Sequence, residues 1–500
     1  MAANAYFAAK LSDDEVVDWS PVGIADRFRK FFVARLTYSG VSKLLFMEHL
    51  TYLLFLKLDY ERSQRQGRFA QPGVVPAGYS WPKLATKTGE ELRQQLTLVL
   101  TELAKLDQSV EHPELSTTVA IFRDSHIWNA QHLAHLAALI TDEIDPYDWS
   151  SNLLALGEAY EILLTGFCAA EVDSKRETGQ VITPRPLLRA IAQTQLITSE
   201  DTVLDPAPGT GGTLLAAYRE MAGTAGHLPE TAYAGKDRDH QMVRLATMNI
   251  LLNTRRPFSA PAPIQHGDSL AAGGAVIHRP AGTPSPTVVL CNPPFRSNTP
   301  RPTSRHDLLP TPLFPANFLQ HIAVGLPVGA RAAVFVPDSV LTGSTAEKIL
   351  PPLLQTCDLH TMLRLPAGSF RNGTSLSGVK ANVLFFTKCS PSPTGTAATS
   401  RLWIYDARSL TTQALTETEL DDFVDAYAAG LPRHERSPRT YFGSHSYADL
   451  QACRFQLFNL AAGPQAPVEP LRPAKEIAGE IAESLAEARQ IFADLAAELP

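Results

Sequence analysis

Cysteine, long apolar runs and positive charge are all scarce in this chain of 500 residues. The five cysteines form no Cys-x-x-Cys pair, so the sequence indicates neither a disulfide framework nor a zinc site, and a reducing compartment fits. No apolar run approaches the length that crosses a bilayer. The first residues lack the basic region and the apolar core of a signal peptide. We therefore expect a cytoplasmic protein without a metal site or a membrane partner.

The remaining composition is that of an ordinary globular chain, with 44% apolar and 19% charged residues, and its length allows two or three domains. Residues 1–150 are predicted to form a helical domain, residues 151–410 a doubly wound α/β domain, and residues 411–500 a helical C-terminal region. In the first region one leucine stripe indicates core and not a cofactor contact. It consists of Leu44, Leu45, Leu50, Leu53, Leu54 and Leu58.

Further strands and a helix are expected in the α/β region. The run 332–337 indicates a central strand. The runs 382–386 and 402–405 are predicted to pair as an antiparallel hairpin, with the Ser-, Thr- and Pro-rich stretch 390–400 as its long turn. Residues 242–251 have the spacing of an amphipathic helix.

The tetrapeptide Asn292-Pro293-Pro294-Phe295 directly follows the apolar run 287–291, which indicates a buried parallel strand. Open α/β sheets bind ligands at the carboxyl ends of their strands. Two adjacent prolines have no N–H, so this backbone offers carbonyl acceptors, to which Asn292 adds an amide oxygen and Phe295 a flat apolar face. Such a set suits holding the –NH2 of a planar ring and aiming its lone pair. On these four residues alone, a proline-rich turn is an equal alternative.

A glycine-rich turn follows another apolar run, 202–205, and precedes a stretch with helical character. Strand, glycine-rich turn and helix form the layout of a nucleotide-type cofactor site, because glycine lets a ligand touch the backbone and the helix N-terminus offers free N–H groups. The turn, 206–212, contains no Gly-x-Gly-x-x-Gly, and no Lys-Ser/Thr follows it. Neither a dinucleotide fold nor a P-loop therefore fits.

Carboxylates follow two more predicted strands. Asp237 follows the run 232–235, roughly 20 residues after the glycine-rich turn, which is the offset at which an acidic side chain meets a ribose in such folds. Asp268 follows the run 262–266. Taken singly, each Asp is more often a turn residue or a helix cap. Four successive strand ends that all carry ligand groups favour the functional interpretation.

These stretches resemble the modification subunits of type I restriction-modification systems, which are adenine-N6 DNA methyltransferases. Residues 179–185 resemble the segment ahead of the first strand, 205–212 the loop under the methionine part of S-adenosylmethionine, 235–237 a Gly-x-Glu motif, and 292–295 the catalytic motif. Similarity extends from about residue 20 to residue 460 and includes 47–57, 318–321 and 365–370.

The resemblance implies the fold of an S-adenosylmethionine-dependent methyltransferase and a set of site residues. It implies catalysis by Asn292, Pro293, Pro294 and Phe295, with adenine flipped out of the DNA stack. It implies cofactor contacts from Gln180, Val181, Ile182, Thr183, Pro184, Arg185, Asp205, Pro206, Gly209, Thr210, Gly211, Gly212, Asp237, Asp268 and Ser269. Three departures affect that set: Val181-Ile182 replaces an aromatic pair, Pro208 replaces Cys or Ala, and Asp237 replaces Glu.

A net charge of −7 is unfavourable for a protein that grips DNA alone, because Lys and Arg supply most phosphate contacts. Either a partner supplies those contacts or local basic segments do; the candidates are 27–30, 255–256 and 296–305. The last is a surface loop or a lid that orders on DNA. The resemblance implies a specificity subunit with target-recognition repeats and a restriction endonuclease or translocase subunit as partners.

The terminal helix could contact such a partner, or it could pack on its own domain. Its apolar residues repeat at 4-3-4 spacing: Ala488, Phe492, Leu495 and Leu499. The sequence leaves open the target site, the oligomeric state, the role of 296–315, and whether the system is restriction-modification or another phage defence. Two alternatives also remain, namely methylation of another planar amine (cytosine N4, an RNA base or a protein glutamine) and a catalytically idle assembly subunit.

Overall fold

The computed structural model describes residues 17–65, 72–106, 112–126, 130–174, 182–224, 232–254, 256–271, 284–295, 305–366, 369–370, 380–408, 410, 415–416, 418–428, 432–462 and 482. Gln180, Val181 and the predicted terminal helix, apart from residue 482, lie outside these ranges. No helix of the described chain is long and apolar enough to span a bilayer.

One mixed sheet carries the described strands in the order β3-β2-β1-β4-β5-β7-β6-β8-β9. The strands β1 to β5 run parallel to one another, and β7 enters antiparallel between β5 and β6. The doubly wound α/β prediction is confirmed. The strands are β1 Val203–Asp205, β2 Tyr233–Asp237, β3 Ile264–His266, β4 Val288–Cys291, β5 Arg331–Pro337, β6 Cys357–Arg364, β7 Ala381–Lys388, β8 Arg401–Asp406 and β9 Phe442–Ser446.

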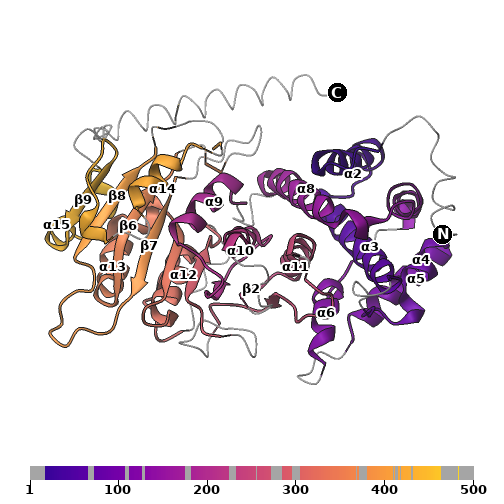
Figure 1. Ribbon diagram of the computed structural model, residues 1–500, viewed down its shortest axis with the longest axis horizontal. Helices are drawn as coiled ribbons and strands as arrows, with labels where there is room; N and C mark the ends of the chain where they lie inside the picture. Colours follow the sequence, from indigo (N-terminus) through magenta and orange to yellow (C-terminus); the bar gives the residue numbers. More distant parts are fainter. Residues whose placement is uncertain are drawn as a thin grey trace.

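Helices cover both faces of this sheet (Figure 1). Alternate strand residues point to opposite faces, so Val203 packs in one cluster and Leu204 in the other. One face carries α9 Arg185–Thr194, α10 Gly212–Thr224, α11 His240–Thr254 and α14 Asp421–Tyr427; the other carries α12 Phe314–Gly325, α13 Gly343–Thr356 and α15 Tyr447–Ala452.

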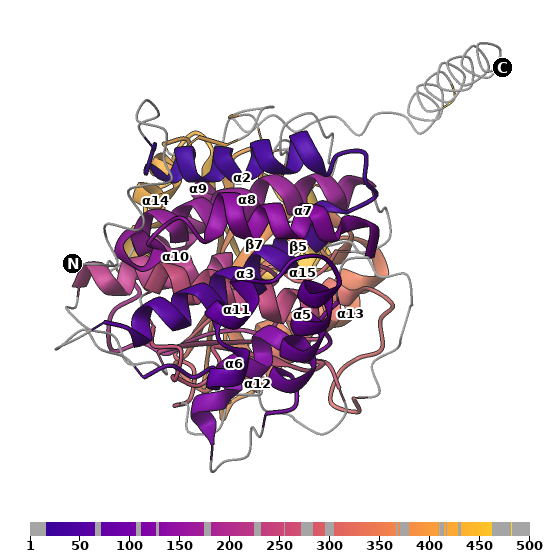
Figure 2. The same ribbon diagram turned by 90° about the vertical axis from the view of Figure 1, so that its right-hand side faces the viewer.

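The N-terminal helices form a separate layer against the sheet domain (Figure 2). Their cluster includes α8 and one side of α11. The predicted leucine stripe is core at Leu50, Leu53, Leu54 and Leu58. Leu44 and Leu45 are only partly buried, and the prediction is wrong for Leu44, which lines the pocket described below. The helix α3 is buried around almost its whole circumference. The helices are α2 Pro21–Arg35, α3 Lys43–Ser63, α4 Trp81–Ala85, α5 Gly89–Leu103, α6 Ser116–Phe122, α7 Leu133–Ala138 and α8 Leu153–Ser174. Short turns are η2 Ala77–Tyr79, η3 Pro113–Leu115, η4 Ala130–His132, η5 Leu139–Ile144, η6 Trp149–Asn152, η7 Asp338–Val340, η8 Arg433–Glu435 and η9 Leu457–Asn459.

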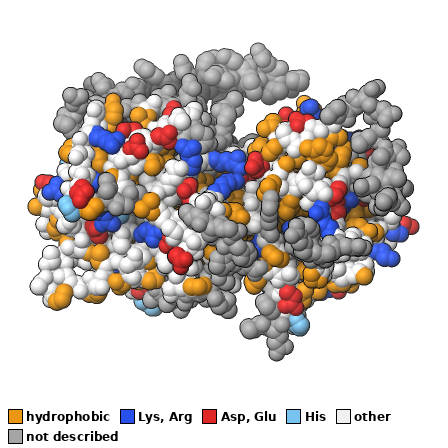
Figure 3. Space-filling view, viewed as in Figure 1, with side chains coloured by type: hydrophobic (Ala, Val, Ile, Leu, Met, Phe, Trp, Pro, Cys, Tyr) orange, Lys and Arg blue, Asp and Glu red, His pale blue; other side chains and the backbone are white. Residues whose placement is uncertain are grey.

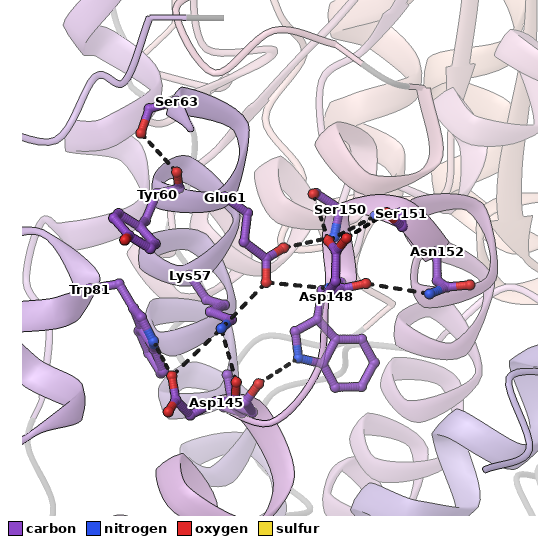
Figure 4. A network of polar contacts seen from close by, with 12 residues as sticks. Lys57, Tyr60, Glu61, Ser63, Trp81, Asp145, Asp148, Ser150, Ser151 and Asn152 are labelled. Atoms are coloured by element: carbon purple, nitrogen blue, oxygen red, sulfur yellow. Dashed lines mark hydrogen bonds and ion pairs between the residues drawn. The ribbon is translucent and has the colours of Figure 1, made fainter. Parts of the chain in front are cut away.

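A buried polar network joins α3 to the turn that leads into α8 (Figure 4). The Lys57 ammonium donates to the Asp145 carbonyl at 3.0 Å and lies 3.4 Å from the Glu61 carboxylate. Trp81 Nε1 donates to Asp145 at 2.8 Å, and Glu61 accepts from the Ser150 N–H at 2.8 Å. Burial raises the pKa of Glu61 to about 7, against the opposing effect of Lys57. These contacts fix the start of α8, which forms one wall of the pocket described below.

Three expectations about the fold are wrong. The runs 382–386 and 402–405 do not pair, because β6 lies between β7 and β8. The region after residue 410 is not only helical, since β9 pairs with β8. The helix α11 is not amphipathic, because it is packed between two clusters; 12 of its 15 residues are buried. The predicted central strand is confirmed as β5, and the three domain limits remain a prediction.

Candidate active site

A cavity of about 790 Å³, its open mouth included, lies at the carboxyl edge of the parallel strands. Its lining includes Asp205 at the end of β1 and Asn292 just after β4. The glycine-rich turn and residues 182–188 form further walls. Three helices complete the lining with Leu44 from α3, Glu161, Leu164 and Thr165 from α8, and Met242 and Asn249 from α11.

Two glycines give the turn after β1 its shape. Gly209 has φ +53° and Gly211 has φ +84°, a region in which side chains are strained. A Cβ at Gly209 would meet nothing within 4 Å, whereas one at Gly211 would lie 3.4 Å from the Ala246 side chain. Gly211 therefore packs on α11 and does not line the cavity, but Gly209 and Gly212 do.

Pro208 packs against Gly235 in the neighbouring strand. A Cβ added to Gly235 would lie 2.9 Å from Pro208 Cγ and 2.9 Å from Ile264 Cδ1. Only glycine at position 235 of β2 leaves room for the turn that follows β1. The departure at Pro208 is thus accommodated by the strand beside it.

Asp205 is fully buried between the turn and α10. Its carboxylate accepts hydrogen bonds from the Ala207 N–H at 2.8 Å and from the Thr213 hydroxyl. Burial raises the pKa of Asp205 to about 7, and the nearby Asp237 adds to this, while the two hydrogen bonds oppose it. The side chain therefore holds the turn against the first turn of α10.

Asp237, the last residue of β2, also contacts the glycine-rich turn. Its carboxylate accepts from the Gly209 N–H at 3.2 Å and from the Asp239 N–H at 2.9 Å. Burial raises the pKa of Asp237 to about 6. Each carboxylate oxygen keeps a further lone pair for a hydroxyl donor.

Asp268 and Ser269 differ in what they contact. The Ser269 hydroxyl donates to the Pro206 carbonyl at 2.7 Å and so ties the loop after β3 to the turn after β1. Asp268 is exposed and accepts from the Leu270 N–H at 2.8 Å, which is a local turn contact. Neither side chain lines the cavity.

The amide of Asn292 donates to the Thr183 hydroxyl at 2.7 Å. Both residues line the cavity, so the tetrapeptide and the segment ahead of α9 meet at the pocket. The Phe295 ring lies edge-to-face with the buried Phe370, with centroids 5.9 Å apart and planes at 86°. Phe370 also contacts Phe335 of β5.

Arginines gather beside the cavity on the face seen in Figure 3, where blue side chains collect near the middle, over the meeting point of α8, α9 and α10. Glu161 of α8 accepts from Arg219 at 2.6 Å and from Arg185. Burial alone would raise the pKa of Glu161, but the two guanidinium groups hold it below its ordinary value. Arg189 pairs with Asp421 at 2.9 Å.

Sequence reasoning missed the residues that position the pocket from outside. Arg244 of α11 is buried and pairs with Glu48 of α3; it also donates to the Ile121 and Arg123 carbonyls at 2.6 Å each. Asn249 donates to the Thr210 carbonyl at 2.9 Å. A signal existed for Arg244, since a charged residue inside an apolar helical run often has a buried partner.

The basic segments proposed for DNA contact include buried arginines. Arg256 is 5% exposed and donates to the Pro261 carbonyl at 2.6 Å. Arg305 is also 5% exposed and is held by Asp307 and His321. Arg27 pairs with Glu143 and Arg29 with Asp26. The predictions for Arg256 and Arg305 are therefore wrong, because both charges are used inside the fold; Arg255, Arg296 and Arg301 lie outside the described residues.

The described residues fit S-adenosylmethionine. In the turn before α10, the space beside Gly209 is empty to 4 Å, so a ligand can approach the backbone there. The N–H groups at the start of α10 suit the carboxylate of the cofactor. Asp237 stands at a strand end with lone pairs for ribose hydroxyls. Asp205 lines the cavity, whereas Asp237 contacts the glycine-rich turn without lining the cavity.

Known proteins that this chain resembles are DNA methylases. The family model for N-6 DNA Methylase matches residues 152–457. The methylase subunit of type I restriction enzyme StySPI from Salmonella potsdam is 32% identical over 432 residues, which cover 80% of this chain and 75% of that protein. The methylase subunit of EcoKI from Escherichia coli strain K12 is 32% identical over 435 residues, with the same coverage.

Solved structures share the fold. A chain from a structural study of complex assembly and conformational transition in the type I R-M system has TM-score 0.68 and 22% identity, over 95% of this chain and 97% of that chain. The type I methyltransferase subunit from Streptococcus thermophilus has TM-score 0.61 and 16% identity, over 89% and 99%. The chain belongs to the N-6 DNA methylase family. It is a DNA methyltransferase that uses S-adenosylmethionine and acts on adenine N6.

Proposed function

We propose that this chain is the modification subunit of a type I restriction-modification complex and that Asn292, Pro293, Pro294 and Phe295 carry its chemistry. The observation that carries the proposal is that Asn292 and the glycine-rich turn line one cavity. A cofactor on the turn and a base at Asn292 would therefore share a single enclosed space.

In this proposal the target adenine leaves the DNA stack and enters the cavity. The Asn292 side-chain oxygen and the Pro293 carbonyl accept hydrogen bonds from the two N6 hydrogens, which withdraws the nitrogen lone pair from the ring and aims it. Phe295, held at its edge by Phe370, supports the ring plane. S-adenosylmethionine supplies the methyl group. Transfer needs alignment and electrostatics, with no covalent enzyme intermediate.

The cofactor roles are assigned by the same logic. Thr183 and the N-terminus of α10 would hold the methionine end, with Gly209, Thr210 and Gly212 beneath it. Asp237 would accept the ribose hydroxyls. Asp205 and Ser269 would hold the turn rather than the ligand, since their contacts are to the turn itself. Asp268 would meet the adenine end, and Gln180 to Arg185 would contact the cofactor.

The partners are proposed from the relatives and from charge. The similar proteins named above are subunits of type I restriction enzymes, so we infer a specificity subunit, a restriction subunit and DNA as partners. A net charge of −7 supports a shared DNA surface. Arg185, Arg189 and Arg219 are each about two-fifths exposed beside the cavity and suit the DNA backbone there. We also propose a cytoplasmic location, in which the chain would meet its DNA substrate.

One experiment tests the proposal. The chain, alone and with a specificity subunit encoded beside its gene, is incubated with DNA and labelled S-adenosylmethionine, and the methylated nucleoside is identified by mass spectrometry. We expect N6-methyladenine, formed at a defined site only with the specificity subunit. N4-methylcytosine would refute the target assignment, and efficient site-specific transfer by the chain alone would refute the subunit assignment.

A further inference from the structure

A second cavity lies at the opposite edge of the sheet from the active site. It has a volume of about 960 Å³, its open mouth included. Arg331, one of its lining residues, is the first residue of β5, whereas the active site lies at the carboxyl ends of the strands. We call this cavity the arginine pocket. Its lining includes Gln195, Asp201, Arg331, Tyr427, Arg433 and Arg436.

The arginine pocket has one positive charge in excess. Arg331 is paired with Asp201 at 2.7 Å, and Arg433 is paired with Asp358 beneath the pocket. Arg436 forms no salt bridge with any residue that the structure describes; it donates to the Thr361 hydroxyl at 2.8 Å and lies 4.5 Å from the Tyr427 ring centroid. The cation of Arg436 is 8% exposed, and a buried charge of this kind calls for an anion.

Two buried polar atoms of the pocket have no hydrogen-bond partner within the described chain. One is the Nε of Arg436, which is a donor, and the other is the side-chain oxygen of Gln195, which is an acceptor. Gln195 is only 3% exposed, so water access is restricted. Buried polar atoms are nearly always satisfied, because an unmatched one costs roughly 1–3 kcal/mol. A ligand that offers both an acceptor and a donor would match both atoms.

The backbone around the pocket is strained in addition. Leu196 has φ +45° and Ala428 has φ +48°, and both line the pocket. Non-glycine residues adopt this conformation at a cost, and such positions cluster at ligand sites. The two strained residues and the two polar atoms without a partner therefore belong to the same pocket.

We propose that the arginine pocket binds a phosphate group that keeps one P–O–H, either hydrogen phosphate or a phosphate monoester. Its anionic oxygens match the cation and N–H of Arg436 and the exposed side of Arg433, since guanidinium groups suit phosphate. Its hydroxyl donates to the Gln195 oxygen. Sulfate and the phosphodiesters of DNA carry negative oxygens but no hydroxyl, so they leave the Gln195 oxygen unmatched. The pocket is therefore distinct from a DNA-backbone contact.

The test measures anion binding by calorimetry on the full chain near pH 6, where phosphate is protonated, with inorganic phosphate, ribose 5-phosphate and sulfate as separate probes. We expect phosphate to bind at least tenfold more tightly than sulfate. Gln195→Met, which removes the acceptor and nearly keeps the volume, should abolish that preference. Tighter binding of ribose 5-phosphate than of phosphate would identify a monoester as the ligand, and equal binding would identify free phosphate.

A second pair of variants keeps the proposal testable if Gln195→Met lowers the melting temperature. Arg433→Gln removes a cation from the pocket and should weaken phosphate binding about tenfold. Arg439→Gln is the matched control, because Arg439 is exposed to a similar extent, pairs with Asp422 at 2.7 Å and does not line the pocket. Equal affinities for phosphate and sulfate, or phosphate binding unchanged by Arg433→Gln, would overturn the proposal. The absence of any binding at a phosphate concentration of about 10 mM would also overturn it, because a Kd of that size (about 3 kcal/mol) is roughly the weakest that calorimetry can follow.

Discussion

Asn292 donates to the hydroxyl of Thr183 across 2.7 Å, which joins the catalytic tetrapeptide to a segment 109 residues earlier in the chain. The contact brings the proposed base-binding residue to the proposed cofactor wall. It also orients the Asn292 amide, because the nitrogen that faces Thr183 leaves the oxygen on the other side of the group.

Asn292→Ala should lower methyl transfer by about 100-fold or more, since it removes a positioned hydrogen bond to the reacting amine. Affinity for S-adenosylmethionine should stay within a few-fold, because Asn292 is assigned to the adenine. Single-turnover rates and calorimetry measure the two effects. Thr183→Val serves as the comparison and should weaken both, given that Thr183 lies on the cofactor wall and orients Asn292. Normal turnover by Asn292→Ala would remove the tetrapeptide from the mechanism.

Gly211→Ala should weaken cofactor binding through packing and not by filling the cavity. Gly211 has φ +84°, where a side chain is strained, and its Cβ would touch Ala246 of α11 at 3.4 Å, so relief of the strain must move the turn that carries Gly209 and Gly212. Gly329→Ala is the matched control, with φ +86° and nothing within 4 Å of its Cβ. Both variants should lose about 1–2 kcal/mol of stability from backbone strain. Only Gly211→Ala should raise the Kd for S-adenosylmethionine.

Cofactor affinity should fall below about pH 6. Burial raises the pKa of Asp237 to about 6, so its carboxylate, which the ribose needs, is lost as the pH drops through that value. Folding stability responds in the opposite sense, because a raised pKa stabilises the protonated folded state. That contribution is complete below the ordinary pKa of 3.8 and disappears as the pH rises through about 6. Asp237→Asn should bind the cofactor more weakly and flatten the profile between pH 5 and 7 (roughly one unit on each side of that pKa).

Glu48 and Arg244 couple the helical layer to the pocket. The pair is buried and fixes α11, which packs on Gly211 and holds the Thr210 carbonyl through Asn249. Glu48→Gln should destabilise the fold by about 3–5 kcal/mol, because it leaves a buried guanidinium without its counter-ion. Denaturant titration with and without S-adenosylmethionine measures the loss of stability and of cofactor affinity together. The exposed pair Arg93–Glu90 is the control, and Glu90→Gln should leave the denaturation midpoint nearly unchanged.

The parts of the site that sequence predicted are those encoded locally. Apolar runs that end in turn residues located β1, β2, β3 and β4, and glycine spacing located the turn after β1. Strand order was not encoded locally, so β6 between β7 and β8 was missed. Burial of Arg305 was missed for the same reason, since its partner His321 lies on α12, beyond a proline-rich stretch. The cavity walls that α3 and α8 supply depend on how the helical layer packs against the sheet domain. The spacing of apolar residues along one helix does not predict such packing.

Deleting residues 474–500 should weaken assembly with a specificity subunit and leave cofactor binding unchanged. The terminal segment repeats apolar residues at Ala488, Phe492, Leu495 and Leu499, which suits a helix-to-helix contact, and the residues assigned to the cofactor end at Ser269. The isolated chain should bind duplex DNA weakly and with little sequence preference, because its net charge is −7. Adding the specificity subunit should tighten binding at one sequence by about a thousandfold. Size-exclusion chromatography and DNA titrations measure both steps; assembly that is unaffected by the deletion would mean that the subunits meet through another surface.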